Sequence, residues 1–384
     1  MDREEVLTQA AQLVPVLTQQ ASQADTLRTM PLETVDDLTS GDLLRLSIPE
    51  RFGGLGSEFD VVPHVVSELG RGCGSTAWCY AVWASCNLVV GTFPIEAQEE
   101  YWSTGTNTLC AAIWNPSQSK SLTATSGGYR LSGRWDFASG CDAARWVLVM
   151  GMSPSGPLMM LVPRSDITIV DTWFASGLKG TGSKDIVIED AFIPEQRALP
   201  IRAIQEAEAP GRLIDHSVNY QIPAFLLTGY TLSASIIGMA RGAVHTFRQI
   251  MTDQISPMRT GAMSQLAGVQ MRLAEASMEV EAAQLIVQHD LYDIFSRARR
   301  GDVATVKQRM HSRCCQAYVA TLGVRAVDRL FAAAGGRALQ ESNTLQRFYR
   351  DAHAASHHAG LSWDILSEQY GRVLLGLDPT YMRF

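Results

Sequence analysis

The sequence lacks the features of several common protein classes. It has no run of basic residues and a net charge of −7. We therefore expect no nucleic-acid partner, because contacts to phosphates need clustered positive charge. No signal peptide is visible at the start, and the seven cysteines contain no CxxC pair. Scattered cysteines without a spaced framework favour reduced thiols in a cytoplasmic protein.

One stretch without a charged residue, 72–95, is long enough to suggest a membrane span. It also contains serine, threonine, asparagine and proline, so its apolar residues are not continuous. A buried helix under a cofactor is the better interpretation, and we expect no membrane partner.

Motifs that bind nucleotides or metals are also missing. No GxGxxG fingerprint follows a predicted strand, and the GTGS tract at 180–183 lacks the GK[ST] ending of a phosphate loop. His353 and His357 have the four-residue spacing of a helical metal clamp. No third ligand follows at a matching distance and there is no HExxH, so we predict no metal site.

Hydrophobic periodicity divides the chain into three zones. The first zone is typical of helices, although Pro15 is expected to kink or break the first of them. The middle zone has short β-rich runs separated by glycine and serine turns, which is typical of an antiparallel β domain. A loop or lid around 203–222 precedes the last zone, where long helical periodicity returns. The predicted long helices are 225–256, 263–297, 303–334 and 343–374.

These zones predict an α+β fold. The expected units are an N-terminal helical domain at 1–105, a central antiparallel β domain at 106–205 and a C-terminal four-helix bundle at 206–384.

Five ordered blocks then become specific. They are IPERFGGLG at 48–56, GSTAW at 74–78, RWDFASGCDAARW at 134–146, GLKGTGSKDIVIEDAFIP at 177–194 and RFYRDAHAASHH at 347–358. In this order and at these distances they resemble the acyl-CoA dehydrogenase superfamily. The closer resemblance is to its two-component flavin monooxygenase branch, which includes the oxygenase component of p-hydroxyphenylacetate hydroxylase and the steroid-ring hydroxylase of cholesterol degradation. The resemblance covers nearly the whole chain, and it implies a homotetramer with a flavin between the β domain and the bundle.

The resemblance also separates two chemistries. A dehydrogenase needs a carboxylate base to take the α-proton while hydride leaves for the flavin. The position that carries this glutamate in most dehydrogenases is Ala359 here, and the tyrosine before it is His358. Relatives with the glutamate on the first bundle helix align near Thr228, which is not acidic either. The dehydrogenase or oxidase reaction is therefore the disfavoured alternative.

The monooxygenase branch implies that reduced FMN or FAD reacts with O₂ to give a C4a-hydroperoxide, which lasts only where water is excluded. His358 stands where that branch carries an active-site histidine, with His357 as the alternative if the register differs by one. A histidine at this place suits acid or base catalysis on the substrate or the peroxide.

The resemblance implies further flavin contacts. Ser139 matches the residue that bonds flavin N5 or O4, beside Gly140, and Phe137 matches an aromatic residue packed by the ring system. For Ser139 and Gly140 the structural alternative is a simple strand-end turn. For Arg259 it is a solvated side chain, and for Gly335 and Gly336 it is a plain helix end. The remaining matched positions are Ser183, Arg259, Gly335 and Gly336.

A substrate wall is predicted on the uncharged helix, where several aromatic hydroxylases carry a histidine. That place is Cys86 here, followed by Asn87. Trp83 on the same helix and Trp114 on a strand could stack a flat ring, together with His358. Core packing is the structural alternative for these side chains.

The predicted function is hydroxylation of a small phenolic, indole-like or polycyclic substrate with O₂. Because the chain has no dinucleotide fingerprint, a separate NAD(P)H:flavin reductase is expected to supply the reduced flavin. An amine N-hydroxylase, an acyl-CoA dehydrogenase or oxidase, and a non-catalytic ligand-binding protein remain the alternatives.

Overall fold

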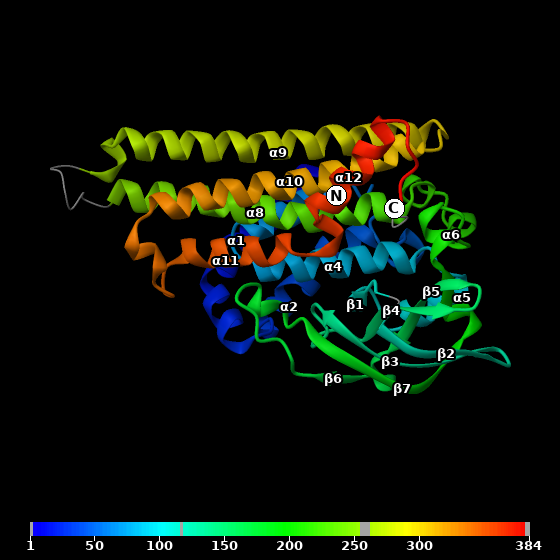
Figure 1. Ribbon diagram of the computed structural model, residues 1–384. Coiled ribbons are helices and arrows are strands. Elements are labelled where there is room, and N and C mark those ends of the chain that lie inside the picture. Colours follow the sequence, from blue (N-terminus) through cyan, green and yellow to red (C-terminus); the bar gives the residue numbers. More distant parts are fainter. Residues whose placement is uncertain (1–2, 116–117, 254–261, 381–384) are drawn as a thin grey trace.

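The computed structural model describes residues 3–115, 118–253 and 262–380. The long C-terminal helices form one side of the molecule, the β strands form the opposite side, and α4 (Gly74–Val90) runs between them (Figure 1). Every one of its residues except Val82 is buried. This position between two packed layers explains why α4 is apolar on every side.

The N-terminal zone is helical, as predicted. Its elements are α1 (Arg3–Leu27), α2 (Leu32–Ser40), η1 (Leu43–Ser47), η2 (Glu50–Phe52), α3 (Val61–Gly70), α4 and α5 (Ile95–Trp102). The prediction that Pro15 kinks or breaks the first helix is wrong in one respect, because α1 continues through it. Proline leaves the carbonyl of Ala11 without its helical donor, and that residue is only partly buried, so water can replace the bond.

The middle zone folds into two four-stranded sheets. The strands are β1 (Cys110–Ile113), β2 (Ser119–Thr125), β3 (Gly128–Ala138), β4 (Trp146–Ser153), β5 (Gly156–Pro163), β6 (Thr168–Val170), β7 (Lys184–Pro194) and β8 (Ala198–Pro200). They pair in the orders β1-β4-β5-β8 and β2-β3-β7-β6. All pairs are antiparallel except β1 with β4, which is parallel and corrects the purely antiparallel prediction. The β-rich runs identified from the sequence do not include β2 or β8.

The two sheets enclose a small core of their own. Trp135 is completely buried there, and its indole Nε1 donates to the Met150 carbonyl at 2.9 Å. Alternate residues of β3 face this core, as expected for a strand that is buried on one side. A rigid base of this kind fixes the turn that leaves the end of β3.

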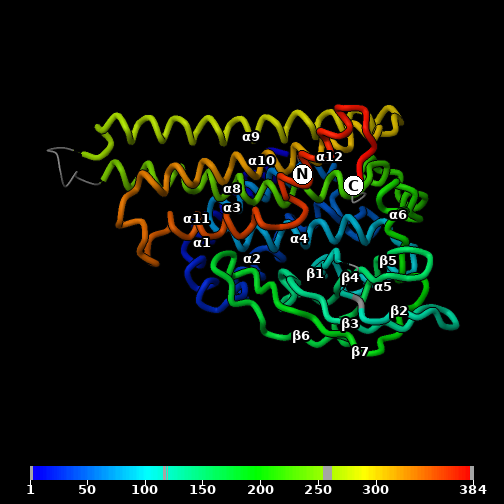
Figure 2. The backbone as a smooth tube through the Cα atoms, in the orientation of Figure 1, coloured from blue at the N-terminus to red at the C-terminus, as the bar shows by residue number. Residues whose placement is uncertain are grey.

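The last zone is helical, with α8 (Ala224–Asp253), α9 (Ala267–Arg299), α10 (Val306–Ala333), α11 (Thr344–Ser356) and α12 (Trp363–Leu374). The predicted fourth helix, 343–374, is therefore two helices. Figure 2 follows the chain from α11 through a turn into α12. The predicted lid region contains short helices, α6 (Ile201–Gln205) and α7 (Gly211–Ile214). Among the described residues, no helix is long and apolar enough to cross a membrane.

Candidate functional site

A row of hydroxyl groups joins the end of β3 to the short helix η5 (Lys179–Thr181) that precedes β7. The Oγ atoms of Ser139 and Ser183 are 2.7 Å apart, and Ser183 Oγ lies 2.6 Å from Thr181 Oγ1. The backbone supports the row, because the Gly140 N–H donates to the Thr181 carbonyl at 2.8 Å. All three hydroxyl residues are buried.

The partners at each end fix the direction of this hydroxyl row. Thr181 donates its proton to the Leu178 carbonyl at 2.8 Å, so it accepts from Ser183. Ser183 then has no second proton and accepts from Ser139. Ser139 in turn accepts from the indole N–H of Trp78 at 3.1 Å. A hydroxyl oxygen has two lone pairs, so Ser139 keeps one free as an acceptor.

Trp78, on the first turns of α4, connects this row to the C-terminal part of the chain. Its ring meets the imidazole of His358 edge to face, with centroids 5.5 Å apart. His358 lies just after the end of α11, where it caps η10 (Ala359–Leu361). Because the chain turns between α11 and α12, this histidine lies against α4.

The hydrogen bonds of His358 indicate its tautomer. Its Nδ1 accepts from the Gly360 N–H at 3.1 Å, so the proton of the neutral ring is on Nε2. Burial, assisted by the positive charge of Arg313, lowers the pKa of His358 to about 4. The ring is therefore neutral near pH 7 and has an N–H to donate.

Arg313 is a site residue that the sequence analysis missed. It comes from α10, donates through Nη2 to the Gly360 carbonyl at 3.2 Å and pairs with Gln316. Gln316 in turn donates to the Leu226 carbonyl on α8 at 2.9 Å. These contacts hold the His358 turn against two bundle helices. The sequence signal that could have identified it is an arginine and a glutamine three residues apart on a helix face with the pattern of a buried one.

Asp351, on α11, connects this helix to the start of η5 next to the same site. Its Oδ1 accepts from the Leu178 N–H at 2.7 Å, while Oδ2 has no hydrogen-bond partner among the described residues. Burial and the nearby charge of Asp25 raise the pKa of Asp351 to about 7. The aspartate thus fixes the distance between the hydroxyl row and the helix that leads to His358.

Phe137 differs from its neighbours in both exposure and backbone. Its side chain is 65% exposed, and its φ of 67° is in the left-handed region that a phenylalanine rarely adopts. Its ring meets Trp173 edge to face, with centroids 6.1 Å apart. An exposed aromatic side chain on a strained backbone, two residues before Ser139, is typical of a position kept for a ligand.

Gly140 and Trp83 pack against each other on the other side of the turn. Gly140 has a φ of +70°, and a Cβ at this position would lie 2.6 Å from the indole Nε1 of Trp83. Both residues line a cavity of about 190 Å³ next to α2. Trp83 therefore supports the turn from behind and does not share the face of α4 that carries Trp78.

Two predicted substrate contacts are corrected by their surroundings. Asn87 is buried and accepts from the Tyr101 hydroxyl at 2.9 Å, with Ser47 on its other side. Cys86 is completely buried beside Cys110 of β1. Neither side chain has surface to offer a substrate, so both belong to the core.

Ser85, which bonds Thr231 on α8 at 3.0 Å, marks the face of α4 that lies toward the bundle.

Trp114 has a more suitable position. It follows β1, is only partly buried, and meets Phe225 at the start of α8 edge to face, with centroids 5.1 Å apart. Because Phe225 is adjacent to Leu226, this aromatic pair is joined through Gln316 to the Arg313 and His358 cluster. Trp114 thus stays a candidate for one wall of a substrate site.

The remaining predicted residues lie elsewhere. Gly335 has a φ of +70° and, with Gly336, follows the end of α10; a Cβ on either would touch no atom of the described residues within 4 Å. Arg259 lies outside the described residues. His353 bonds Asp328 at 2.7 Å, whereas His357 donates to the His353 carbonyl at 2.8 Å, so this pair does not converge.

These residues fit a reduced flavin. The free lone pair on Ser139 can accept an N–H, which the reduced ring presents at N5 and the oxidised ring does not. Phe137 offers an exposed aromatic face beside that acceptor. This acceptor and the aromatic face thus match the ring system that the sequence resemblance implies.

Comparisons with known proteins agree with this geometry. The family model of the acyl-CoA dehydrogenase N-terminal domain matches residues 3–108, and that of the acyl-CoA dehydrogenase C-terminal domain matches residues 230–363. Both matches correspond to the helical zones on either side of the β domain.

Individual relatives cover almost the whole chain. The FADH(2)-dependent resorcinol hydroxylase, oxygenase component, of Rhizobium sp. (strain MTP-10005) is 32% identical over 94% of this chain and 91% of its own. The flavin-dependent monooxygenase, oxygenase subunit HsaA, of Rhodococcus jostii (strain RHA1) is 30% identical over 96% and 97%. The crystal structure of the HsaA monooxygenase from M. tuberculosis superposes with a TM-score of 0.93 at 29% identity, covering 99% of each chain.

The predicted fold class is therefore confirmed. With two family models, full-length relatives and a site that fits reduced flavin, this chain belongs to the acyl-CoA dehydrogenase superfamily, in the branch of flavin-dependent monooxygenase oxygenase components.

Proposed function

We propose that this protein hydroxylates a small aromatic substrate with O₂ and reduced flavin. The observation that carries the proposal is the hydroxyl row, which ends in a free acceptor on Ser139 and adjoins the Trp78–His358 pair. The relatives named for aromatic hydroxylation support it. Ala359 and Thr228, the two positions of a dehydrogenase base, carry no carboxylate.

The flavin, when bound, supplies the electrons that activate O₂. In our proposal Ser139 accepts the N5–H of the reduced ring, and the directed row behind it keeps the Ser139 proton pointed away. Phe137 packs beside the ring and helps to exclude water. Exclusion of water is what such chemistry needs, because reactive oxygenated species decay when solvent reaches them.

His358 acts as a hydrogen-bond donor in this scheme. Its Nδ1 is occupied by the Gly360 N–H, so the neutral ring presents Nε2–H. That N–H can donate to the oxygen that leaves or to the substrate hydroxyl. A base role for His358 would first require that Nε2 lose its proton or that Nδ1 leave the Gly360 N–H.

The aromatic substrate is proposed to lie between Trp78 and the Trp114–Phe225 pair. Tryptophan walls bury a flat ring efficiently and orient it by edge-to-face contacts. Phenolic, indole-like and polycyclic rings all fit this description. The indole-3-acetate monooxygenase of Acinetobacter baumannii, 25% identical over 94% of this chain, is a relative with such a substrate in its name.

A separate NAD(P)H:flavin reductase and a homotetramer complete the proposal. The chain has no dinucleotide fingerprint, so reduced FMN or FAD must come from another protein. In a tetramer, Gly335 and Gly336 can lie against the flavin of a neighbouring subunit, since a Cβ on either would meet no atom of the described residues within 4 Å. Arg259 is proposed to reach a flavin phosphate, and Ser183 to act through Ser139.

The test is oxygen consumption with chemically reduced FMN or FAD and a panel of phenols, indoles and polycyclic compounds. We expect product from at least one panel member without any reductase or NAD(P)H. The proposal fails if every member gives only hydrogen peroxide. Bleaching of an oxidised, yellow protein by an acyl-CoA would instead support the dehydrogenase reaction.

A further inference from the structure

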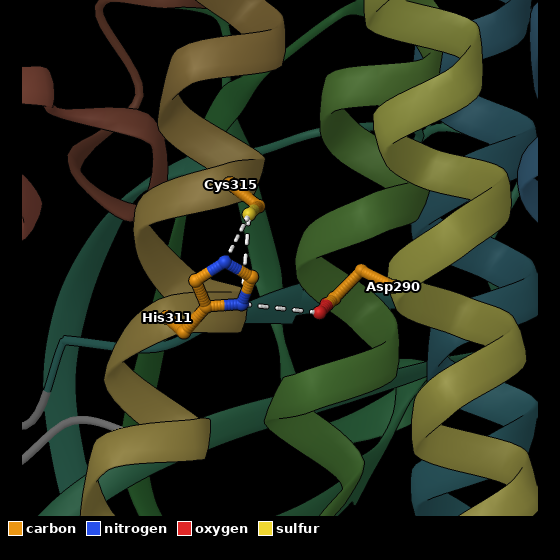
Figure 3. Close-up of side chains that lie close together, drawn as sticks. All are labelled: Asp290, His311 and Cys315. Carbon is orange, nitrogen blue, oxygen red and sulfur yellow. Dashed lines mark hydrogen bonds and ion pairs between the residues drawn. The ribbon is translucent and has the colours of Figure 1, made fainter.

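A second cluster of reactive side chains lies between α9 and α10. Figure 3 shows His311 and Cys315 on α10, one helical turn apart, with Asp290 reaching toward them from α9. None of the three contacts the Ser139 row or His358 in the interactions described above. The proposed oxygenation does not use them.

The distances between these atoms match a metal site. His311 Nδ1 is 3.4 Å from Asp290 Oδ1 and 3.9 Å from Cys315 Sγ, and one ligand atom from each residue falls within 4.8 Å of the others. Tetrahedral zinc with its usual bond lengths places nitrogen about 3.3 Å from oxygen and about 3.6 Å from sulfur. The nitrogen-to-oxygen distance already matches, whereas Cys315 Sγ is nearer to Nε2 than to Nδ1 and has to turn toward Nδ1 to complete the set.

The sulfur of Cys315 lies close to both nitrogens of the His311 ring. Cys315 Sγ is 3.6 Å from Nε2 of His311 and 3.9 Å from Nδ1, so it lies beside the edge between the two nitrogens. A turn of the Cys315 side chain would bring this sulfur to the Nδ1 side of the ring, where Asp290 Oδ1 lies.

The carboxylate is prepared for this task. Asp290 is only 3% exposed, and its Oδ2 accepts from the Tyr230 hydroxyl of α8 at 2.5 Å. This bond fixes the carboxylate and leaves Oδ1 facing His311. Metal ligands in proteins are usually oriented in this way by an outer hydrogen-bond partner.

Access and a fourth position are also present. Asp290 and His311 line a cavity of about 360 Å³ that also exposes Gln308 and Tyr370. The cavity is large enough to admit an ion and to hold a water as its remaining ligand.

We propose that Asp290 Oδ1, His311 Nδ1 and Cys315 Sγ bind one Zn²⁺, with water from the cavity as the fourth ligand. Mixed sulfur, nitrogen and oxygen ligands suit zinc better than magnesium or calcium, which prefer oxygen alone. The ion would join α9 to α10. The site is independent of the proposed hydroxylation.

The test compares two neighbouring cysteines in the full chain. Protein dialysed against a chelator is titrated with Zn²⁺ by calorimetry, and with Co²⁺ to look for a sulfur-to-cobalt charge-transfer band. We expect one ion per chain, the band, and a higher Tm with Zn²⁺. Cys314→Ser, which changes the adjacent thiol outside the cluster, should keep all three.

Cys315→Ser should abolish the band and weaken Zn²⁺ binding at least about 10–100-fold, the loss that even removal of an outer partner of a ligand causes. Asp290→Asn and His311→Gln should weaken it similarly, and an unchanged circular dichroism spectrum would show that the variants fold. Absence of stoichiometric binding in the wild type, or equal binding in Cys314→Ser and Cys315→Ser, would overturn the proposal.

Discussion

The indole of Trp78 lies between Ser139 and His358, donating to the serine hydroxyl at 3.1 Å and meeting the imidazole edge to face at 5.5 Å. One side chain on α4 thus links the turn of the β domain to the break between α11 and α12. A movement of the C-terminal helices that shifts His358 would therefore also shift the Trp78 ring and its hydrogen bond to Ser139.

The first prediction concerns His358→Ala. Oxygen should still be consumed with reduced flavin, but hydroxylated product should fall about 10²–10⁴-fold while hydrogen peroxide rises, because the Nε2–H donor is lost. Product and peroxide measured in the same reaction check this. His357→Ala is the matched control, since its ring bonds the His353 carbonyl and is exposed. Equal product from wild type and His358→Ala would remove His358 from the mechanism.

Ser139→Ala should increase uncoupling for a different reason. The flavin N–H loses its acceptor, a hydrogen bond whose net value of about 1 kcal/mol corresponds to roughly a fivefold effect. The indole N–H of Trp78 also becomes unsatisfied, so the Tm should fall. Ser183→Ala interrupts the same row but leaves Ser139 free to accept. If both variants give the same peroxide yield with reduced flavin, the terminal acceptor has no special role.

The pH dependence of hydroxylation should reflect a neutral His358. Because burial and Arg313 lower its pKa to about 4, the neutral ring that accepts the Gly360 N–H on Nδ1 persists at every pH above that value. Coupling should therefore stay flat from roughly pH 8 to 5, whereas an ordinary histidine would titrate near 6.5. The same pKa shift makes the stability of the fold depend on pH. The unfolded chain protonates this histidine at a higher pH than the folded chain does, so the free energy of unfolding falls as pH drops from about 6.5 to 4.

Arg313→Gln is the variant that tests this cause. It removes the positive charge but keeps a donor for the Gly360 carbonyl, so the pKa of His358 should rise toward its ordinary value. The acid limb of the coupling profile should move to higher pH, while KM for the aromatic substrate changes little. A wild-type acid limb already centred near pH 6.5 would contradict the argument.

Asp351→Asn should change the pH dependence of stability. The folded pKa of about 7 is above the ordinary value of 3.8, so this carboxyl stabilises the fold at low pH and that contribution is lost between about pH 4 and 7. The asparagine amide oxygen can still accept from Leu178. The variant should therefore gain Tm relative to wild type at pH 8 and gain less at pH 5.

The size of that gain has an upper limit. Each pKa unit corresponds to about 1.4 kcal/mol, so the difference is at most on the order of 4 kcal/mol. Asp190→Asn, which changes an exposed carboxylate, is the control and should give the same Tm difference from wild type at both pH values. A variant of Asp351 that is destabilised equally at pH 5 and pH 8 would contradict the assigned cause.

The parts of the site that the sequence predicted are those carried by turns. Ser139 directly follows β3 and Ser183 directly precedes β7, each next to a glycine, and His358 closes a block recognised by resemblance, so their neighbourhood could be anticipated. The alternation of β3 and the periodicity of α8 to α10 were equally visible, because each has one face against a core.

The sequence could not assign the faces of α4. This helix is apolar all round, so its pattern has no direction, and only the packing of α8 and η1 shows that Asn87 faces away from Trp78. Arg313 was missed for a related reason: a buried arginine is distinguished by its partners, and those come from Gly360 and Gln316. The break after Ser356 likewise has only one nearby glycine as a signal.

The Trp78–His358 contact also has a consequence for the newly made chain. Ser183 leaves the ribosome long before His358, which comes 175 positions later. At about 5–20 residues per second, His358 is added roughly 10–35 s after Ser183. The contact between Trp78 and His358 can therefore form only when synthesis is almost over.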